Sequence, residues 1–156
     1  MHMAGLRFFS VYQGFGGNEK HKGEYANTVA QFADAIAAGE APELFGDGTQ
    51  TRDFTHVRDV ARACELAADH ELTGVYNVGT ETAYSFNEMI DMINEALGTD
   101  VAPEYVECPF DGYVHDTLAD ASKFREATGW EPEVDFEEGV ELVCAPYRES
   151  DASDSE

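Results

Sequence analysis

Apolar residues recur at helical spacing in several stretches of the chain. In residues 25–38 and 85–97 the apolar positions lie three or four residues apart, which is typical of a helix with one buried face. The second stretch also has helix-end signals, since Ser85 and Glu88 form a capping-box pattern and Gly98 follows as a stop. Further helices are predicted from Asp59 to Ala67, over 120–128 and over 136–144. The pattern therefore predicts about five helices.

Short runs of β-branched and aromatic residues alternate with these helices. The predicted strands are 6–12, 44–45, 52–57, 74–79 and 105–106. A helix or a long loop separates each strand from the next, which indicates the α/β class. The first run is strongly apolar, and such a strand usually lies in a sheet whose other strands come from elsewhere.

The length of 156 residues suits one domain with a real core. We assign residues 5–146 to this domain. The first residues, 1–4, read as an artificial start and carry no structural weight in the prediction. Residues 147–156 are polar and acidic, and we predict a disordered tail there.

Acidic residues dominate the charge of the chain. There are 32 Asp and Glu against 9 Lys and Arg, which gives a formal net charge of −23. The acids are spread along the whole sequence between intact apolar patterns, so we favour a halophilic surface, with a haloarchaeal source, over an acidic surface for a basic partner. Either interpretation argues against binding of nucleic acid, which requires a cationic face.

Cysteine usage and hydropathy indicate which cellular compartment fits the sequence. Cys64, Cys108 and Cys144 are odd in number and widely spaced, which favours free thiols in a reducing cytoplasm over a disulfide framework. No apolar run has the length of a membrane span, and no signal peptide is visible. His56 and His115 have no Cys or Asp partner at a recognisable spacing, so we predict no metal site.

Several segments, in order, resemble one enzyme family. They are Gly5-Leu6-Arg7-Phe8-Phe9-Ser10-Val11-Tyr12, then Glu19 to Gly23 with Tyr25-Ala26-Asn27, then Phe45 to Val60 (FGDGTQTRDFTHVRDV), then Tyr76 to Gly79, Leu118 to Lys123 and Gly129 to Pro132. Together they resemble the extended short-chain dehydrogenase/reductase family, the NAD-dependent nucleotide-sugar epimerases and dehydratases. The HKG loop is similar to the branch that includes UDP-glucose 4-epimerase-like and heptose-nucleotide 6-epimerase-like proteins. Residues 5–12 are similar to the family's late Rossmann strand.

The resemblance implies the C-terminal, substrate-binding portion of such an enzyme. Two family motifs are missing from these residues. Gly14-x-Gly16-Gly17 is not the GxGxxG turn that holds the pyrophosphate of NAD, and no Tyr-x-x-x-Lys pair is present. We therefore expect NAD in the intact enzyme, none bound to this chain alone, and no catalysis by this chain alone.

The resemblance assigns Arg52 to the diphosphate of a nucleotide sugar, because a guanidinium can hold phosphate oxygens bidentately. The alternative is an ion pair with Asp53 or Asp47. Lys22 is implied as a second acid/base beside the sugar, with a mobile loop lysine as the alternative. His21 reads as an orienting or a surface group.

The remaining candidates each have a structural alternative. Asn27 and Tyr25 are implied as substrate contacts, or else as a helix-start hydrogen bond and an aromatic packing residue. The resemblance places Leu44 and Phe45 beside the nucleotide base and Tyr113 beside a phosphate or the sugar, although core packing and a rim position would look the same. Ser10 and Tyr12 stand where the family lines the nicotinamide and the substrate.

Two other functional hypotheses stay open. One is a non-catalytic module of this ancestry that self-associates through the surface where a Rossmann half would dock. The other is a subunit completed by a separate NAD-binding chain. All three hypotheses share a nucleotide-diphosphate sugar as the expected ligand or ancestral ligand.

Overall fold

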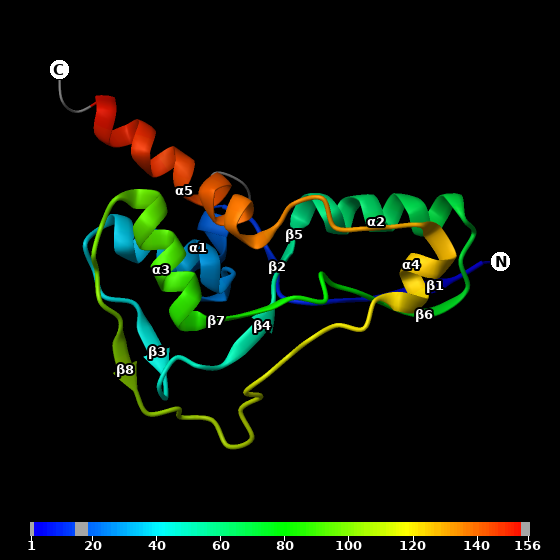
Figure 1. Cartoon of the computed structure of the whole chain (residues 1–156), viewed down its shortest axis with the longest axis horizontal. Coiled ribbons are helices and arrows are strands. Elements are labelled where there is room, and N and C mark those ends of the chain that lie inside the picture. Colours follow the sequence, from blue (N-terminus) through cyan, green and yellow to red (C-terminus); the bar gives the residue numbers. More distant parts are fainter. Residues whose placement is uncertain (1, 15–18, 154–156) are drawn as a thin grey trace.

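The computed structural model describes residues 2–14 and 19–153, which form five α-helices and eight β-strands. Figure 1 shows an elongated molecule with the N-terminus and the C-terminus at opposite ends. The buried apolar residues form two clusters. These observations confirm the predicted α/β class with five helices.

The smaller cluster lies in the part of the molecule near the N-terminus. Strand β1 (Ala4–Phe8) pairs in parallel with β6 (Gly74–Val78). Helices α2 (Val57–Asp69) and α4 (Ser122–Thr128) pack on this pair. Trp130 and Phe124 fill the core between them.

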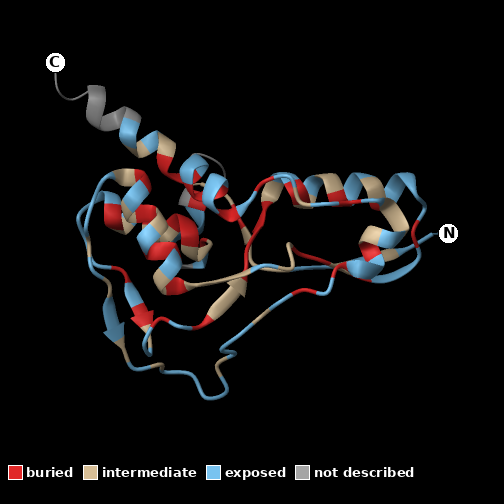
Figure 2. Ribbon diagram, viewed as in Figure 1, coloured by how far each residue is buried: buried red, intermediate tan, exposed pale blue. Residues whose placement is uncertain are grey.

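The larger cluster lies where α1 (Thr28–Ala37), α3 (Phe86–Leu97) and α5 (Phe136–Ser153) meet. Figure 2 shows the buried residues concentrated there. Strand β3 (Glu43–Phe45) pairs in parallel with β8 (Glu104–Val106) beside these helices. None of the helices in the described part of the chain is long and apolar enough to cross a membrane.

Two further strand pairs join the clusters. Strand β2 (Val11–Tyr12) pairs in parallel with β5 (Thr55–His56), and β4 (Thr51–Asp53) pairs antiparallel with β7 (Ala83–Ser85). A 3₁₀ segment, η2 (Lys20–Tyr25), precedes α1. Residues 107–121, named the crossover segment below, run from β8 to α4 along the lower edge of Figure 1 and are mostly exposed in Figure 2.

The predicted ends of α3 are confirmed. The Ser85 hydroxyl accepts a hydrogen bond from the Glu88 N–H, and the Glu88 carboxylate accepts one from the Ser85 N–H. Gly98 ends the helix in the left-handed conformation, at φ 68°. These local signals depend only on neighbouring residues, which is why the sequence was sufficient to place them.

The predicted strand over residues 5–12 is interrupted in the structure. Ser10 has φ 27°, a conformation outside the β region, and it separates β1 from β2. The two pieces therefore pair with different partners, β6 and β5. The helix predicted from residue 25 begins instead at Thr28, because Asn27 has extended backbone angles and caps it.

The last helix is longer than predicted. It was expected to end at Cys144, with residues 147–156 as a disordered tail, but α5 continues to Ser153. Arg148 explains part of the extension, since its guanidinium donates to the Ala96 carbonyl and the Glu141 carboxylate. Residue 1, residues 154–156 and residues 15–18 of the predicted glycine loop lie outside the described residues.

Candidate functional site

A cavity of about 760 Å³ opens between the larger cluster and the central strands. Its volume is within the range of small-molecule sites. The lining residues come from β2 and the residue before it, α1 and the two residues before it, the α1–β3 connection, β3, β4 and the residue after it, α3 and the crossover segment: Ser10, Val11, Tyr12, Ala26, Asn27, Thr28, Val29, Gln31, Phe32, Ala35, Ala41, Pro42, Glu43, Phe45, Arg52, Phe54, Phe86 and Tyr113. Six of the candidate site residues predicted from the sequence are among these lining residues.

Arg52 on β4 is the cation of this cavity lining. Its Nη1 donates to the carbonyls of Thr51 at 2.7 Å and His115 at 2.8 Å, and its Nη2 donates to the Val114 carbonyl at 2.8 Å. Among the described residues no carboxylate forms an ion pair with it, so the alternative of a salt bridge with Asp53 or Asp47 is wrong. Three carbonyl dipoles orient the guanidinium and leave its full charge in place.

Aromatic rings surround the guanidinium of Arg52. Its Cζ lies 5.6 Å from the Phe86 ring centroid and 5.3 Å from the Tyr113 ring centroid. These are cation–π distances. Phe45 packs edge-on against Tyr113 at 5.8 Å, so β3 and the crossover segment meet at the cavity through their side chains. The arrangement presents one positive group among flat apolar surfaces.

Asn27 lies at the cavity and also caps α1. Its Oδ1 accepts from the Ala30 N–H at 2.9 Å, and its Nδ2 donates to the Gln13 carbonyl at 2.9 Å. The helix-start alternative for this residue is therefore present in the structure. Its role toward a ligand stays a prediction, because the same side chain lines the cavity.

Lys22, His21 and Tyr25 lie on η2 and do not line the cavity. The Lys22 ammonium donates to Glu19 Oε1 at 2.5 Å. Burial acts to raise the pKa of Glu19, but hydrogen bonds from Lys22, the Asn27 N–H and Gln13 hold that pKa below its ordinary value. Glu19 thus fixes the start of α1 as an ionised group. Tyr25 is 82% exposed, and packing as its alternative role is wrong.

Leu44 is 1% exposed and belongs to the larger core cluster, as its structural alternative requires. Its neighbour Phe45 lines the cavity, because successive residues of β3 face opposite sides. The sequence did not separate these two roles, since both residues are large and apolar.

A family model described as GDP-mannose 4,6 dehydratase matches residues 15–143, which is most of the chain. The chain belongs to this family. The predicted resemblance to NAD-dependent nucleotide-sugar epimerases and dehydratases is thereby confirmed at the level of the family; the resembling segments from Glu19 onward lie within the matched residues, and residues 5–12 precede them.

Relatives and solved structures match the chain over part of their own length. The UDP-glucose 4-epimerase of Mycolicibacterium smegmatis is 35% identical over 135 residues, which are 86% of this chain and 42% of that protein. The structure of a UDP-glucose 4-epimerase with UDP-glucose from Thermotoga maritima has a TM-score of 0.82 and 35% identity, covering 94% of this chain and 46% of that one. The UDP-glucose 4-epimerase of Thermus thermophilus in complex with NAD has a TM-score of 0.77 and 32% identity, covering 93% and 46%.

The chain therefore spans less than half the length of these dehydratase-family relatives and corresponds to their C-terminal part. Within the described residues, four helices begin with a side-chain cap, from Asn27, His56, Ser85 and Asp135. Each cap accepts from one backbone N–H of the first turn, that of Ala30, Arg58, Glu88 or Glu138. None of these four helix starts follows a glycine-rich turn of the kind that binds the pyrophosphate of NAD.

Ser10 and Tyr12, the two residues predicted to contact the nicotinamide, have different surroundings in the structure. Ser10 lines the cavity with its strained backbone. The Tyr12 ring is 1% exposed and packs edge-on against Phe54, His56 and Phe136, so its hydroxyl lies in the core. Burial and the nearby Asp59 carboxylate raise the pKa of the Tyr12 phenol above its ordinary value, which keeps it protonated at neutral pH.

Several lining residues were missed in the sequence. Phe86 was read as the first turn of a helix, yet its ring packs under Arg52. Phe32 was read as part of an apolar helix face, and it contacts Phe86 at 6.1 Å between centroids. Their spacing fits a core face, so no sequence signal separates core from cavity lining at these positions.

Proposed function

We propose that this chain binds the nucleotide diphosphate of a nucleotide sugar in the cavity at Arg52. One observation carries the proposal. In a chain of net charge −23, Arg52 lines a cavity of suitable size and its guanidinium is held by carbonyls in place of carboxylates. A cation held in this way attracts a phosphate without first having to release another anion.

The intact protein, by this proposal, is an NAD-dependent nucleotide-sugar epimerase or dehydratase. The Thermotoga maritima relative was solved with UDP-glucose and the Thermus thermophilus relative with NAD. NAD, when bound to the intact enzyme, supplies reversible hydride transfer at a sugar carbon. The present residues hold and orient the nucleotide, and alone they neither bind NAD nor catalyse.

Lys22 is proposed as the second acid/base in the intact enzyme, with His21 and Tyr25 beside it. In the structure its ammonium is paired with Glu19. To reach a sugar in the cavity, η2 would have to move and break this pair. Asn27, Phe45 and Tyr113 need no such movement, because they already line the cavity.

The uncovered side of the β1–β6 sheet supports the proposed partners. Val75 is 51% exposed, and its β1 partner Gly5 is exposed on the same face, although parallel sheets are normally covered on both faces. We propose that the NAD-binding half of the enzyme, in the same or a separate chain, covers this surface. The alternative is self-association of a non-catalytic module through the same residues.

The setting of the protein is also proposed. The acidic composition supports a halophilic, haloarchaeal protein, and the widely spaced cysteines support a cytoplasmic one. Cys64, Cys108 and Cys144 are all free thiols in the structure.

Calorimetric titration with UDP-glucose tests the proposal. Arg52→Ala should weaken binding by about 10- to 100-fold, the range expected for hydrogen bonds to a charged group. Arg7→Ala is the matched control, because Arg7 is an exposed arginine on β1 and its loss changes the net charge equally. Equal affinity of the two variants would discard the clamp. Formation of an epimerised sugar nucleotide on adding NAD and UDP-glucose would refute the claim that the chain is inactive alone.

A further inference from the structure

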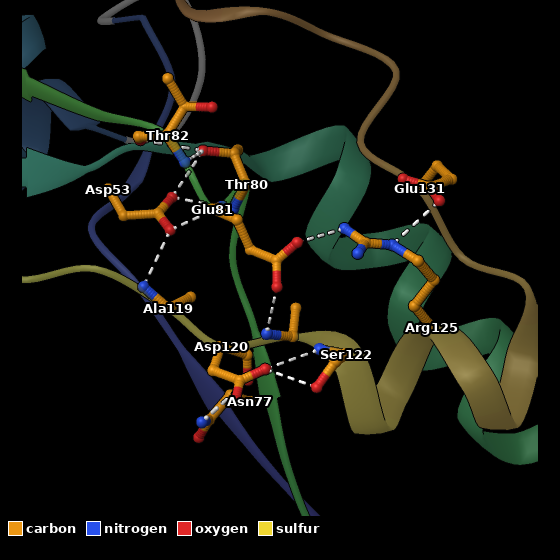
Figure 3. Close-up of polar contacts among 11 residues, drawn as sticks. Asp53, Asn77, Thr80, Glu81, Thr82, Ala119, Asp120, Ser122, Arg125 and Glu131 are labelled. Carbon is orange, nitrogen blue, oxygen red and sulfur yellow. Dashed lines mark hydrogen bonds and ion pairs between the residues drawn. The ribbon is translucent and has the colours of Figure 1, made fainter.

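A fully buried carboxylate lies directly beside Arg52 in the sequence. Asp53 is 0% exposed, and strand alternation places its side chain on the side of β4 opposite to that of Arg52. Its Oδ1 accepts from the Thr80 N–H at 2.8 Å and the Thr80 hydroxyl at 2.7 Å. Its Oδ2 accepts from the N–H groups of Glu81 at 2.9 Å and Ala119 at 3.1 Å. Figure 3 shows these four contacts, which come from two separate loops.

The Ala119 contact fixes one end of the crossover segment. Residues 115–117 of that segment run along the start of β4: the Thr51 N–H donates to the His115 carbonyl at 3.0 Å, and the Thr117 N–H donates to the Thr51 carbonyl at 3.2 Å. This segment supplies two of the three carbonyls that hold the Arg52 guanidinium, those of Val114 and His115. Asp53 is therefore bonded to the same piece of chain that orients Arg52.

The turn on the other side of Asp53 is also tied to the crossover segment. Glu81 has the left-handed φ of 60°, and its carboxylate accepts from the Ala121 N–H at 3.0 Å and from Arg125 Nη2 at 2.5 Å. Close packing accompanies these bonds, since a Cβ at Gly79 would overlap Ala119 and lie 2.9 Å from Asp53 Oδ2. As Figure 3 shows, the two carboxylates hold the β6–β7 turn and the start of α4 in one network.

We propose that Asp53 is a positioning residue for the phosphate clamp. It holds the crossover segment at Ala119 so that the carbonyls of Val114 and His115 aim the Arg52 guanidinium into the cavity. This inference rests on the proposed function, because it assumes that Arg52 grips the diphosphate. It predicts that Asp53 affects the phosphate-dependent part of binding and leaves the nucleoside-dependent part unchanged.

The test compares UDP with uridine, which lacks the phosphates, by NMR titration of the folded chain at one fixed salt concentration. The variant Asp53→Asn retains the size of the side chain but replaces one acceptor oxygen by an NH₂ donor, so at least one of the four N–H or O–H donors loses its acceptor. We expect Asp53→Asn to weaken UDP binding about tenfold and uridine binding by less than about twofold. Asp69→Asn, at an exposed position of α2, is the charge-matched control and should change neither.

A second variant covers the case in which Asp53→Asn does not fold. Thr80→Val removes one hydroxyl donor to Asp53 and retains the backbone contact. It should weaken UDP binding severalfold, again without a change for uridine. Proportional losses of UDP and uridine affinity, or no loss of UDP affinity in a folded variant, would overturn the positioning role.

Arg52→Gln separates this inference from the proposed function. If wild-type protein binds UDP no more tightly than uridine, or if Arg52→Gln does not reduce that preference, the clamp itself is wrong and the positioning role falls with it. If Arg52→Gln removes the preference and the Asp53 and Thr80 variants retain it, the clamp stands and the role of Asp53 is wrong.

Discussion

Gly139 packs directly on the ring of Tyr12, so replacing it tests how closely α5 approaches the central strands. A Cβ built at Gly139 would overlap the Tyr12 hydroxyl oxygen and lie 2.6 Å from the Tyr12 Cζ. Phe54, His56 and Phe136 pack on the ring at centroid distances of 6.3, 5.2 and 5.5 Å, which limits how far it can withdraw. Gly139→Ala must therefore move α5 away from β2.

Two opposing terms set the size of the effect. Alanine is favoured over glycine inside a helix by about 1 kcal/mol. Overpacking a well-filled core costs about 1–3 kcal/mol, and the overlap with two ring atoms places this substitution at the upper end. Gly139→Ala should therefore lower the free energy of unfolding by about 2 kcal/mol. Ala61→Gly, at an exposed position within α2, measures the helix term alone in the same protein.

Urea unfolding gives the free energies, followed by circular dichroism and by the fluorescence of Trp130, the single tryptophan. The Tyr12 hydroxyl is buried and has no hydrogen-bond partner among the described residues, so Tyr12→Phe alone should be close to neutral. In the double variant it removes the overlapping oxygen and should restore about 1 kcal/mol. A Gly139→Ala protein more stable than wild type would show that the close approach of α5 to Tyr12 is wrong.

Two further predictions concern pH and salt. Burial, and after it the Arg58 charge, lowers the pKa of His56, whose Nδ1 accepts from the Arg58 N–H as the cap of α2. Because the folded pKa lies below the unfolded value, the stability that neutral His56 contributes is present above about pH 6.5. It is lost as the pH falls through the folded pKa. As the pH falls from about 8 to 5, wild type should lose more unfolding free energy than His56→Asn, which caps the helix without titrating. A constant difference between the two free energies over this range would contradict the prediction. The net charge of −23 should make the melting temperature rise between about 0.1 M and 1 M KCl, as the screening length falls from about 10 Å to 3 Å; an unchanged melting temperature would remove the support for a halophilic surface.

Local signals in the sequence were sufficient for most elements of the fold. The caps and spacing of α3 predicted its start at Ser85 and its end at Gly98 because each signal involves residues within one turn. The break at Ser10 was not predictable in this way. Its neighbours are all strand formers, and what separates β1 from β2 is pairing with two partners, β6 and β5, that are distant in the sequence.

The candidate site was predicted only in part. Arg52, Asn27 and Phe45 belong to the segments that resemble the family and do line the cavity, as does Tyr113 outside them, whereas Lys22 belongs to such a segment and is paired elsewhere. The role proposed for Asp53 was missed because an acid next to an arginine reads as its salt-bridge partner. The two-residue period of a strand, applied to 52–57, would have placed the two side chains on opposite faces.

Arg52 contacts carbonyl groups, whereas several other arginines form ion pairs in the structure. Arg62, Arg125 and Arg148 each bind a carboxylate, as expected in a chain with 32 acidic residues. Carbonyl groups orient a guanidinium but do not neutralise it, so at Arg52 the attraction for a phosphate at contact distance persists. The repulsion of that phosphate by the net charge acts over longer distances and decays within about 3 Å in 1 M salt. Molar salt therefore weakens the opposing long-range term more than the short contact, so the proposed phosphate clamp agrees with the proposed halophilic setting.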